Sequence, residues 1–386
     1  MAYISSETYS FILHAVCCFM HGKTADPSML GGLDAADLME QSEAHSLTAV
    51  VAEALAEALN DRSLFTEAQA ADWAEKKNHT IRTNMLFTAE RSKVFSLLEQ
   101  NKIWHMPLKG YAVNECYPNP LLRRSSDVDV LFDSSKAEFL RDLMNKNGYE
   151  TEDFGGKDHD VYFKPPFYTF EMHRILVDDK HGKTWYDYYK NVKQERLKKV
   201  DGKEYEYCFN NNDFYIYFVV HAVKHVRYSG TGLRTLADLY ACFTRLGLDV
   251  KYIENEFKKL GIYEDEQILR GLALKLFSKE ALNGQVKLND EEAATLEKMI
   301  FAGVYGNHDL YIENNFKKIS GGKEGGSKLS YTLYRLFPPA ELYRNTYPFF
   351  YKHKAARPFL IFVRAFDIVT KRRKNLINEI NLVKKM

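Results

Sequence analysis

The first hundred residues place apolar side chains at the three- and four-residue spacing of helices. Leu47–Leu59 follows this pattern, and Thr83–Gln100 places its apolar residues along one helical face. The apolar run Tyr9–Met20 follows Glu7 and lacks the basic start of a signal peptide, so it predicts a buried helix. We therefore expect an N-terminal helical region over residues 1–100.

The pattern changes between residues 101 and 207. Helices are predicted for Gly110–Cys116 and for Ser134–Asn147, the second with Ser134 or Ser135 as its cap. Shorter apolar or alternating segments between them are typical of strands, and they cover residues 103–108, 128–132, 149–154, 161–163 and 168–176. This order predicts a small α/β unit with a mixed sheet.

Helical periodicity returns in residues 208–320, with helices predicted over 214–228 and 233–246. Residues 320–327 (SGGKEGGS) predict a flexible loop or linker. We assign residues 321–386 to this linker and to basic, aromatic C-terminal helices, which can dock on a domain core or contact an anionic membrane or nucleic-acid surface. The predicted fold class is α+β, a small mixed-sheet core flanked by N- and C-terminal helical regions.

Composition narrows the function classes. The 386 residues are 45% hydrophobic and 27% charged, and the net charge is +1, which argues against nucleic-acid binding over the whole surface but allows a local basic patch. The five cysteines form no CxxC pair, so a disulfide framework and a structural zinc cluster lose support. No apolar run reaches the length of a membrane span. These features predict a soluble protein of the reducing cytoplasm.

The segment 106–132, MPLKGYAVNECYPNPLLRRSSDVDVLF, carries the most chemistry. Asp127 and Asp129 stand two apart as the chain enters a strand, so their carboxylates point to the same side of the sheet. Close carboxylates repel unless a cation neutralises them, and a hard divalent ion such as Mg²⁺ is the simplest remedy. In the absence of metal, Asp129→Asn is therefore expected to keep or raise stability.

A later strand supplies a third acid. In Tyr168–Leu176, Glu171 and His173 share one face, and Glu171 lies in the middle of an otherwise apolar strand. Metal binding beside Asp127 and Asp129 is one reason for an acid there, and pairing with Arg174 is another. His173 is a candidate to order a metal ligand or a nucleotide.

The combination of LKG, YPNP, an arginine, DVDVLF and FEMHRIL resembles the nucleotidyltransferase superfamily of the DNA polymerase β-like fold. With HAVKH and LRTLADLY, the chain is similar to a group of bacterial nucleotidyltransferase family proteins over roughly residues 80–245. The resemblance implies a nucleoside triphosphate substrate and two Mg²⁺ ions. Asp127 and Asp129 would bridge the ions, and Glu171 would ligate the one that activates the acceptor.

The resemblance also implies a phosphate-binding turn at Lys109 and Gly110. The superfamily turn carries a small residue after the glycine, whereas Tyr111 stands here, which puts the usual phosphate geometry in doubt. Lys109 is then expected to supply charge to the phosphates, and Ser125 and Ser126 offer hydrogen bonds close to the aspartates.

Arg123 has two open roles, a phosphate contact or a bidentate salt bridge that holds the loop. Arg234 and Asp238 stand four apart and predict a helical ion pair. His221 and His225 have the same spacing, which is compatible with a pair of metal ligands, but no third ligand accompanies them and packing or hydrogen bonding is expected. The resemblance adds Lys224 and His225 as substrate contacts, and Arg234 is a further candidate.

The function expected from these motifs is Mg²⁺-dependent transfer of an NMP, most simply AMP, from an NTP to a hydroxyl acceptor. The acceptor is open among a small molecule, a protein side chain and an RNA end. The alternative is a catalytically weak nucleotide-binding regulatory module or a protein-interaction module.

Overall fold

The computed structural model describes residues 6–156, 158–179, 182–283 and 286–303, together with His353, Phe359 and Leu360. The chain forms two compact units, Met1–Lys224 with Thr231–Val304, and His225–Gly230 with Tyr305–Met386. The linker predicted at 320–327 lies outside the described residues, as do the C-terminal helices expected after it, apart from the three residues just named.

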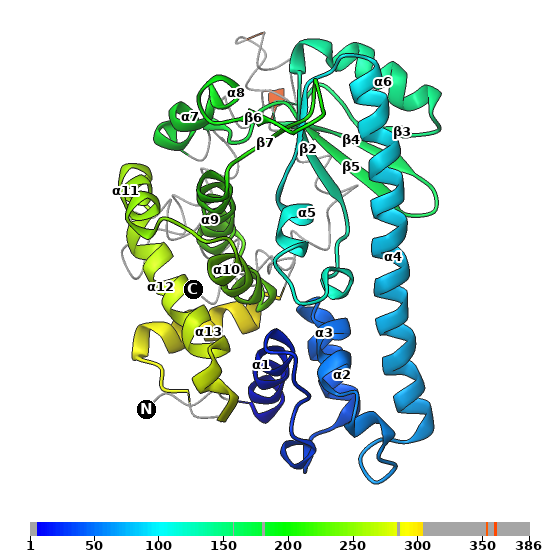
Figure 1. Ribbon diagram of the computed structural model, residues 1–386, viewed down its shortest axis with the longest axis vertical. Coiled ribbons are helices and arrows are strands. Elements are labelled where there is room, and N and C mark those ends of the chain that lie inside the picture. The colour runs from blue at the N-terminus through cyan, green and yellow to red at the C-terminus, as the bar shows by residue number, and fades with distance from the viewer. Residues whose placement is uncertain are drawn as a thin grey trace. The chain divides into compact units, whose positions relative to one another are not determined.

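A five-stranded sheet in the order β1-β2-β5-β4-β3 lies in the first unit (Figure 1). β2 and β5 are parallel, and the other neighbours are antiparallel. Parallel neighbours need a long connection, which helix α6 and the hairpin β3–β4 supply. The strands are β1 (His105–Pro107), β2 (Val128–Phe132), β3 (Glu150–Asp153), β4 (His159–Lys164) and β5 (Tyr168–His173); a second sheet pairs β6 (Lys198–Lys199) with β7 (Tyr207–Cys208).

One face of this sheet forms a hydrophobic core. Val128 and Val130 of β2 and Phe170 and Met172 of β5 pack there with apolar residues of α4 (Glu67–Gln100) and α6 (Ala137–Lys146). Helix α4 runs along this side of the sheet (Figure 1). Burying each such side chain contributes about 1.5–3 kcal/mol, so the alternation of β2 and β5 is strongly specified. The alternate residues, including Asp129 and Glu171, therefore face away from this core.

Helical segments precede and follow the five-stranded sheet along the chain. The helix α1, near the start of the chain, packs on α3 and also on α12, which follows the sheet. These contacts join the two helical regions, and the α+β class with helical flanks is confirmed. The remaining helices are α1 (Glu7–Met20), α2 (Ala35–Ala44), α3 (Thr48–Ala54), α5 (Lys109–Asn114), α7 (Lys183–Tyr189), α8 (Val192–Glu195), α9 (Asn211–Tyr228), α10 (Arg234–Arg245), α11 (Val250–Leu260), α12 (Tyr263–Phe277) and α13 (Asp290–Ala302).

Many elements follow the sequence pattern, but β5 ends at His173 rather than at residue 176, and α7, α8, β6 and β7 were not predicted. Helix α4 begins at Glu67 rather than near Thr83, because Thr66 and Gln69 form a capping box ahead of a run of good helix formers. The segment after β2 is capped by Asp133, whose Oδ1 accepts from the Ser135 amide at 3.2 Å, and not by a serine. Most of α1 is buried, as predicted. None of the described helices has the length and apolar character that crossing a membrane requires.

Candidate active site

Strands β2 and β5 bring acids from two distant segments into register. Asp129 is paired with Glu171, and Leu131 with His173. Directly paired residues of neighbouring strands point to the same face. The side chain of Asp129 is 10% exposed and that of Glu171 is 30% exposed, so the pair is half-enclosed rather than sealed in the core.

His173 completes a group around these acids. One ligand atom each from Asp129, Glu171 and His173 lie within 4.8 Å of one another. His173 Nε2 is 2.7 Å from Asp129 Oδ1 and 3.7 Å from Glu171 Oε2. Because an ionised carboxylate only accepts, Nε2 carries the hydrogen and donates it to Asp129. The imidazole thus orients the carboxylate.

Lys109 places a positive charge on the other oxygen of Asp129. It begins α5, directly after β1, and its Nζ lies 3.4 Å from Asp129 Oδ2. The same Nζ is 2.7 Å from Nε2 of His221, which belongs to α9. An ammonium group only donates, so His221 Nε2 accepts and the ring hydrogen is on Nδ1. The lysine is therefore held between the sheet and α9.

The three acids differ in pKa. Burial would raise the pKa of Asp129, but the charges of Lys109 and His173 and their hydrogen bonds outweigh it and hold the pKa well below its usual range. Burial, together with the charges of Asp129 and Asp127, raises the pKa of Glu171 to about 7. Burial and the charge of Asp129 also raise the pKa of Asp127. A bound cation would relieve this repulsion.

The donor set suits a hard divalent ion. Carboxylate oxygens are the ligands that Mg²⁺ prefers, and Asp129 and Glu171 offer them in one register pair. Asp127 lies two residues before Asp129 and repels both acids, but its oxygens are outside the group within 4.8 Å. The sequence predicted a cluster of three carboxylates. The structure instead groups the carboxylates of Asp129 and Glu171 with His173, and Asp127 lies further out.

A small pocket lies beside the aspartates. Apart from its chain neighbours and the backbone of α5, a Cβ at Gly110 would meet no heavy atom within 4 Å, so no distant segment covers the backbone there. Ser125, which also accepts a hydrogen bond from Asn114 at 3.4 Å, lines the same pocket, whereas Ser126 is exposed and does not. The lining residues come from α4, the end of β1, α5 and the start of β2 with the residues just before it: Asn84, Phe87, Thr88, Arg91, Pro107, Leu108, Gly110, Tyr111, Asn114, Ser125, Asp127, Val128 and Asp129.

Tyr111 lines the same pocket as Gly110. Its side chain is 42% exposed, and the guanidinium carbon of Arg91 lies 3.9 Å from the centre of its ring. The ring is thus stacked on Arg91 of α4 and forms part of the pocket wall.

Arg123 makes the salt bridge that was one of its two expected roles. Its Nε and Nη2 donate to the two carboxylate oxygens of Asp238 at 2.7 and 2.8 Å, and both side chains are buried. Tyr117 also donates to Asp238, at 2.6 Å, and Arg123 donates to Asn114 at 2.8 Å. Arg123 therefore ties the loop before β2 and helix α5 to α10, and its donors face protein acceptors rather than the pocket.

The structure also places the three residues expected to contact the substrate, Arg234, Lys224 and His225. The predicted ion pair of Arg234 with Asp238 is not formed, because Arg123 occupies both oxygens; Arg234 donates instead to the Arg124 carbonyl at 3.0 Å. Lys224 is half-buried at the end of the first unit. His225 belongs to the second unit, where its Nδ1 lies 3.4 Å from the Ser229 hydroxyl.

Arg174, which the sequence offered as a partner for Glu171, pairs instead with buried Asp160, on the neighbouring strand. The residue that sequence reasoning missed is His221. Its spacing to His225 indicated packing, hydrogen bonding or a pair of metal ligands, and no local signal connects it with Lys109, more than a hundred residues away.

A mixed sheet that pairs two acids in register, next to a lysine–glycine helix start, defines a candidate nucleotidyl-transfer core. The uncharacterised nucleotidyltransferase family matches residues 31–278, and this chain belongs to that family. The matched span includes Lys109, both aspartates, Glu171 and His221. No curated protein and no solved structure matches the chain.

Proposed function

We propose that this protein is a Mg²⁺-dependent nucleotidyltransferase that moves an NMP, most simply AMP, from an NTP to a hydroxyl acceptor. The observation that carries the proposal is the register pair of Asp129 and Glu171, half-enclosed and next to Lys109. Membership of the family supports nucleotidyl transfer in general. The open backbone at Gly110 supports phosphate binding beside these groups.

Each site residue has a defined task in this proposal. Asp127, Asp129 and Glu171 would hold two Mg²⁺ ions, which when bound neutralise phosphate charge and favour ionisation of the acceptor hydroxyl. Lys109 adds positive charge near the triphosphate. His173 orients Asp129 through its 2.7 Å hydrogen bond.

The reaction forms one bond and breaks one. The acceptor oxygen bonds to the α-phosphorus of the NTP as the bond from that phosphorus to the bridging oxygen breaks. Pyrophosphate leaves with the bridging oxygen, and the hydroxyl proton is released. The protein mainly positions these groups and compensates charge, as in other phosphoryl-type transfers.

The test is a thermal-stability titration of the full chain with each common NTP, with and without Mg²⁺, followed by an assay of pyrophosphate release with hydroxyl acceptors. We expect Mg²⁺-dependent stabilisation that Asp129→Asn and Glu171→Gln both remove. Asp72→Asn, an exposed residue of α4, makes the same change as Asp129→Asn away from the site and should behave as wild type. Stabilisation that does not depend on the metal, or that survives both site variants, would contradict the proposal.

The same measurements separate a transferase from a nucleotide-binding module. A module without turnover would show Mg²⁺-dependent stabilisation and no pyrophosphate release with any acceptor. The register pair of Asp129 and Glu171 beside Lys109 favours the transferase, because both acids and the charge that a metal-dependent transfer needs are present.

A further inference from the structure

Two pockets of the first unit share the lining residues Trp104 and Lys193, and the two together are here called the Trp104 groove. Their volumes are about 300 and 420 Å³. The inner part lies against Leu131 of β2 and the segment after β5. The outer part lies against the β6–β7 hairpin and the loop before β1. Neither part belongs to the pocket beside Gly110.

The inner part of the groove begins next to the candidate active site. Leu131 follows Asp129 by two residues, so both side chains are on the same face of the sheet. Leu131 is also the register partner of His173. A ligand in the inner part would thus approach the acids from the side opposite to Asp127 and Gly110, where the NTP is expected.

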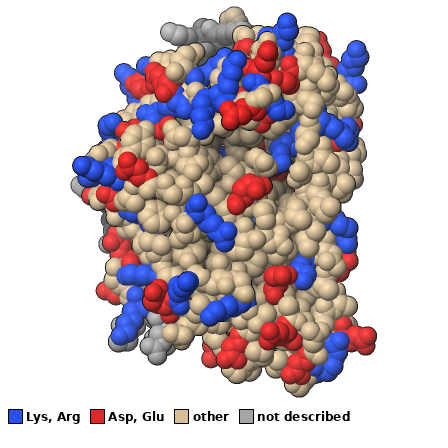
Figure 2. All heavy atoms as spheres, viewed as in Figure 1, with Lys and Arg blue, Asp and Glu red and all other residues tan. Residues whose placement is uncertain are grey.

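Four lysines, Lys102, Lys136, Lys193 and Lys199, line the outer part against two acids, Asp133 and Glu204. Among the described residues, no carboxylate lies within ion-pair distance of these lysines, so their charges are not neutralised by contact. Lys136 donates to the Lys102 and Asn101 carbonyls, at 2.9 and 3.5 Å. Figure 2 shows Lys and Arg gathered, with some acids among them, over the end of the first unit where Figure 1 places β6, β7 and α8. This site therefore suits an anion.

Aromatic rings lie among these lysines. Trp104 and Tyr207 meet edge to face with ring centres 6.2 Å apart, and Tyr205 lines the same wall. The ammonium of Lys193 is 4.7 Å from the Trp104 ring and 5.3 Å from the Tyr207 ring. Rings interleaved with lysines are the combination that binds single-stranded nucleic acid, since bases stack on the rings and phosphates meet the charges. An acidic peptide would use the charges but not the rings.

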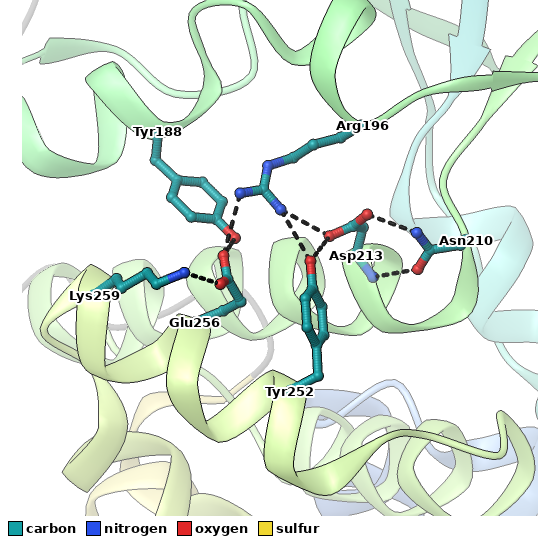
Figure 3. Close-up of polar contacts among 7 residues, drawn as sticks. All are labelled: Tyr188, Arg196, Asn210, Asp213, Tyr252, Glu256 and Lys259. Atoms are coloured by element: carbon teal, nitrogen blue, oxygen red, sulfur yellow. Dashed lines mark hydrogen bonds and ion pairs between the residues drawn. The ribbon is translucent and has the colours of Figure 1, made fainter.

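A buried polar network holds the helical wall of the groove in place (Figure 3). Arg196, at the end of α8, donates to Asp213 at 2.8 Å and to Glu256 at 3.2 Å. Tyr188 of α7 donates to the same Glu256, and Tyr252 donates to Asp213 at 3.0 Å. These contacts fasten α7 and α8 to α9 and α11, so Lys193 is presented from a supported element.

We propose that the Trp104 groove binds the end of a single-stranded nucleic acid and directs its terminal hydroxyl to Asp129 and Glu171. The nucleic acid would then be the acceptor. The binding step stands on the groove alone, whereas the transfer step rests on the proposed function. The net charge of +1 is consistent with binding confined to this local surface.

Binding is tested by the fluorescence anisotropy of labelled single-stranded RNA and DNA with the full chain at several salt concentrations. Lys102→Ala/Lys199→Ala should weaken binding on the order of tenfold and reduce the slope of log affinity against log salt by about 1.4, since each phosphate contact contributes about 0.7. Lys251→Ala/Lys287→Ala removes the same charge from exposed positions elsewhere and should leave the slope unchanged. Equal effects of the two double variants, or equally tight binding of polyglutamate, would overturn the proposal.

Tryptophan emission gives an independent readout. Trp73 and Trp185 are buried at 1% and 4% exposure, whereas Trp104 is half-buried and lines the groove. RNA should quench the emission of the wild type, and Trp104→Phe should remove this quenching while keeping most of the affinity. Quenching that persists in Trp104→Phe would place the bases elsewhere.

The transfer step is tested with RNA that ends in a 3′-hydroxyl and with the matching 3′-deoxy RNA, each with Mg·ATP. Pyrophosphate release that needs the hydroxyl and falls in Lys102→Ala/Lys199→Ala supports the acceptor role. Release with a small hydroxyl compound but not with bound RNA would overturn that role and leave the proposed function intact. RNA binding without any Mg·NTP binding would instead overturn the proposed function and leave the groove as a nucleic-acid site.

Discussion

His173 donates from Nε2 to Asp129 Oδ1 at 2.7 Å, and Lys109 lies 3.4 Å from the other oxygen of the same carboxylate. Asp129 is therefore ionised and held in position before any cation arrives. Its register partner Glu171 makes a longer contact, 3.7 Å from His173 Nε2, and burial and the charges of Asp129 and Asp127 raise its pKa to about 7. The pKa of Asp129 is thus lowered and the pKa of Glu171 is raised, although both are carboxylic acids of the same site.

Asp129→Asn should lower the stability of the metal-free protein. The expectation from repulsion alone was no loss or a gain, but the ionised carboxylate is bound by Lys109 and His173. Hydrogen bonds to charged groups contribute about 1.5–3 kcal/mol, so we expect a loss of that order. Melting curves without metal, compared with those of Asp72→Asn, measure it. A variant that melts at or above the wild-type temperature would show that repulsion dominates.

Glu171→Gln should have the opposite effect, and only at high pH. A folded-state pKa of about 7 lies above the unfolded value of about 4.3. The stability linked to Glu171 is therefore fully present below about pH 4.3 and is lost as the pH rises through 7. The variant does not titrate, so without metal it should exceed the wild type at pH 8, by on the order of 1–3 kcal/mol, and differ little at pH 5.

The control for this pH profile is Glu297→Gln, an exposed residue of α13. It should change stability equally at both pH values. A Glu171→Gln profile parallel to that of the wild type would mean that Glu171 titrates normally and that the acids do not repel.

Gly110→Ala should separate phosphate access from folding. The added methyl group meets no atom within 4 Å beyond its chain neighbours and the helix backbone, and alanine favours the helix by up to about 1 kcal/mol, so stability should hold or rise. If phosphates approach this backbone, NTP-dependent stabilisation should fall sharply. Gly271→Ala makes the same change in α12, where the nearest atom is 3.9 Å away, and should leave NTP binding unchanged. Normal NTP binding by Gly110→Ala would move the phosphate site away from this turn.

Arg123→Ala should unfold the protein at much lower denaturant concentration. It leaves the buried carboxylate of Asp238 without its bidentate partner, and such a loss costs about 3–5 kcal/mol. Arg123→Ala/Asp238→Ala should recover part of this loss, because no unpaired charge remains. Urea unfolding of both single variants and the double variant gives the coupling energy. A stable Arg123→Ala variant that has lost only NTP binding would restore the phosphate role of Arg123.

Local patterns in the sequence determined much of this protein. The alternation of β2 and β5 placed Asp129, Glu171 and His173 on the polar faces of their strands, because the opposite faces must be buried. The break at Tyr117–Pro120 and the glycine after Lys109 marked a short helix between β1 and β2, which the structure confirms as α5. These features depend on residues close together in the chain, where spacing alone carries the information.

Only the tertiary structure decided which partners these residues have. Strand pairing set Asp129 opposite Glu171 rather than one residue away. The packing of α9 placed His221 next to Lys109, and the packing of α10 placed Asp238 next to Arg123. The helical spacing of Arg234 and Asp238 predicted a local pair, but a buried guanidinium with bidentate geometry took the carboxylate instead. The Trp104 groove likewise combines residues from five separate segments. Such contacts depend on how distant surfaces pack, and no spacing along the chain encodes that directly.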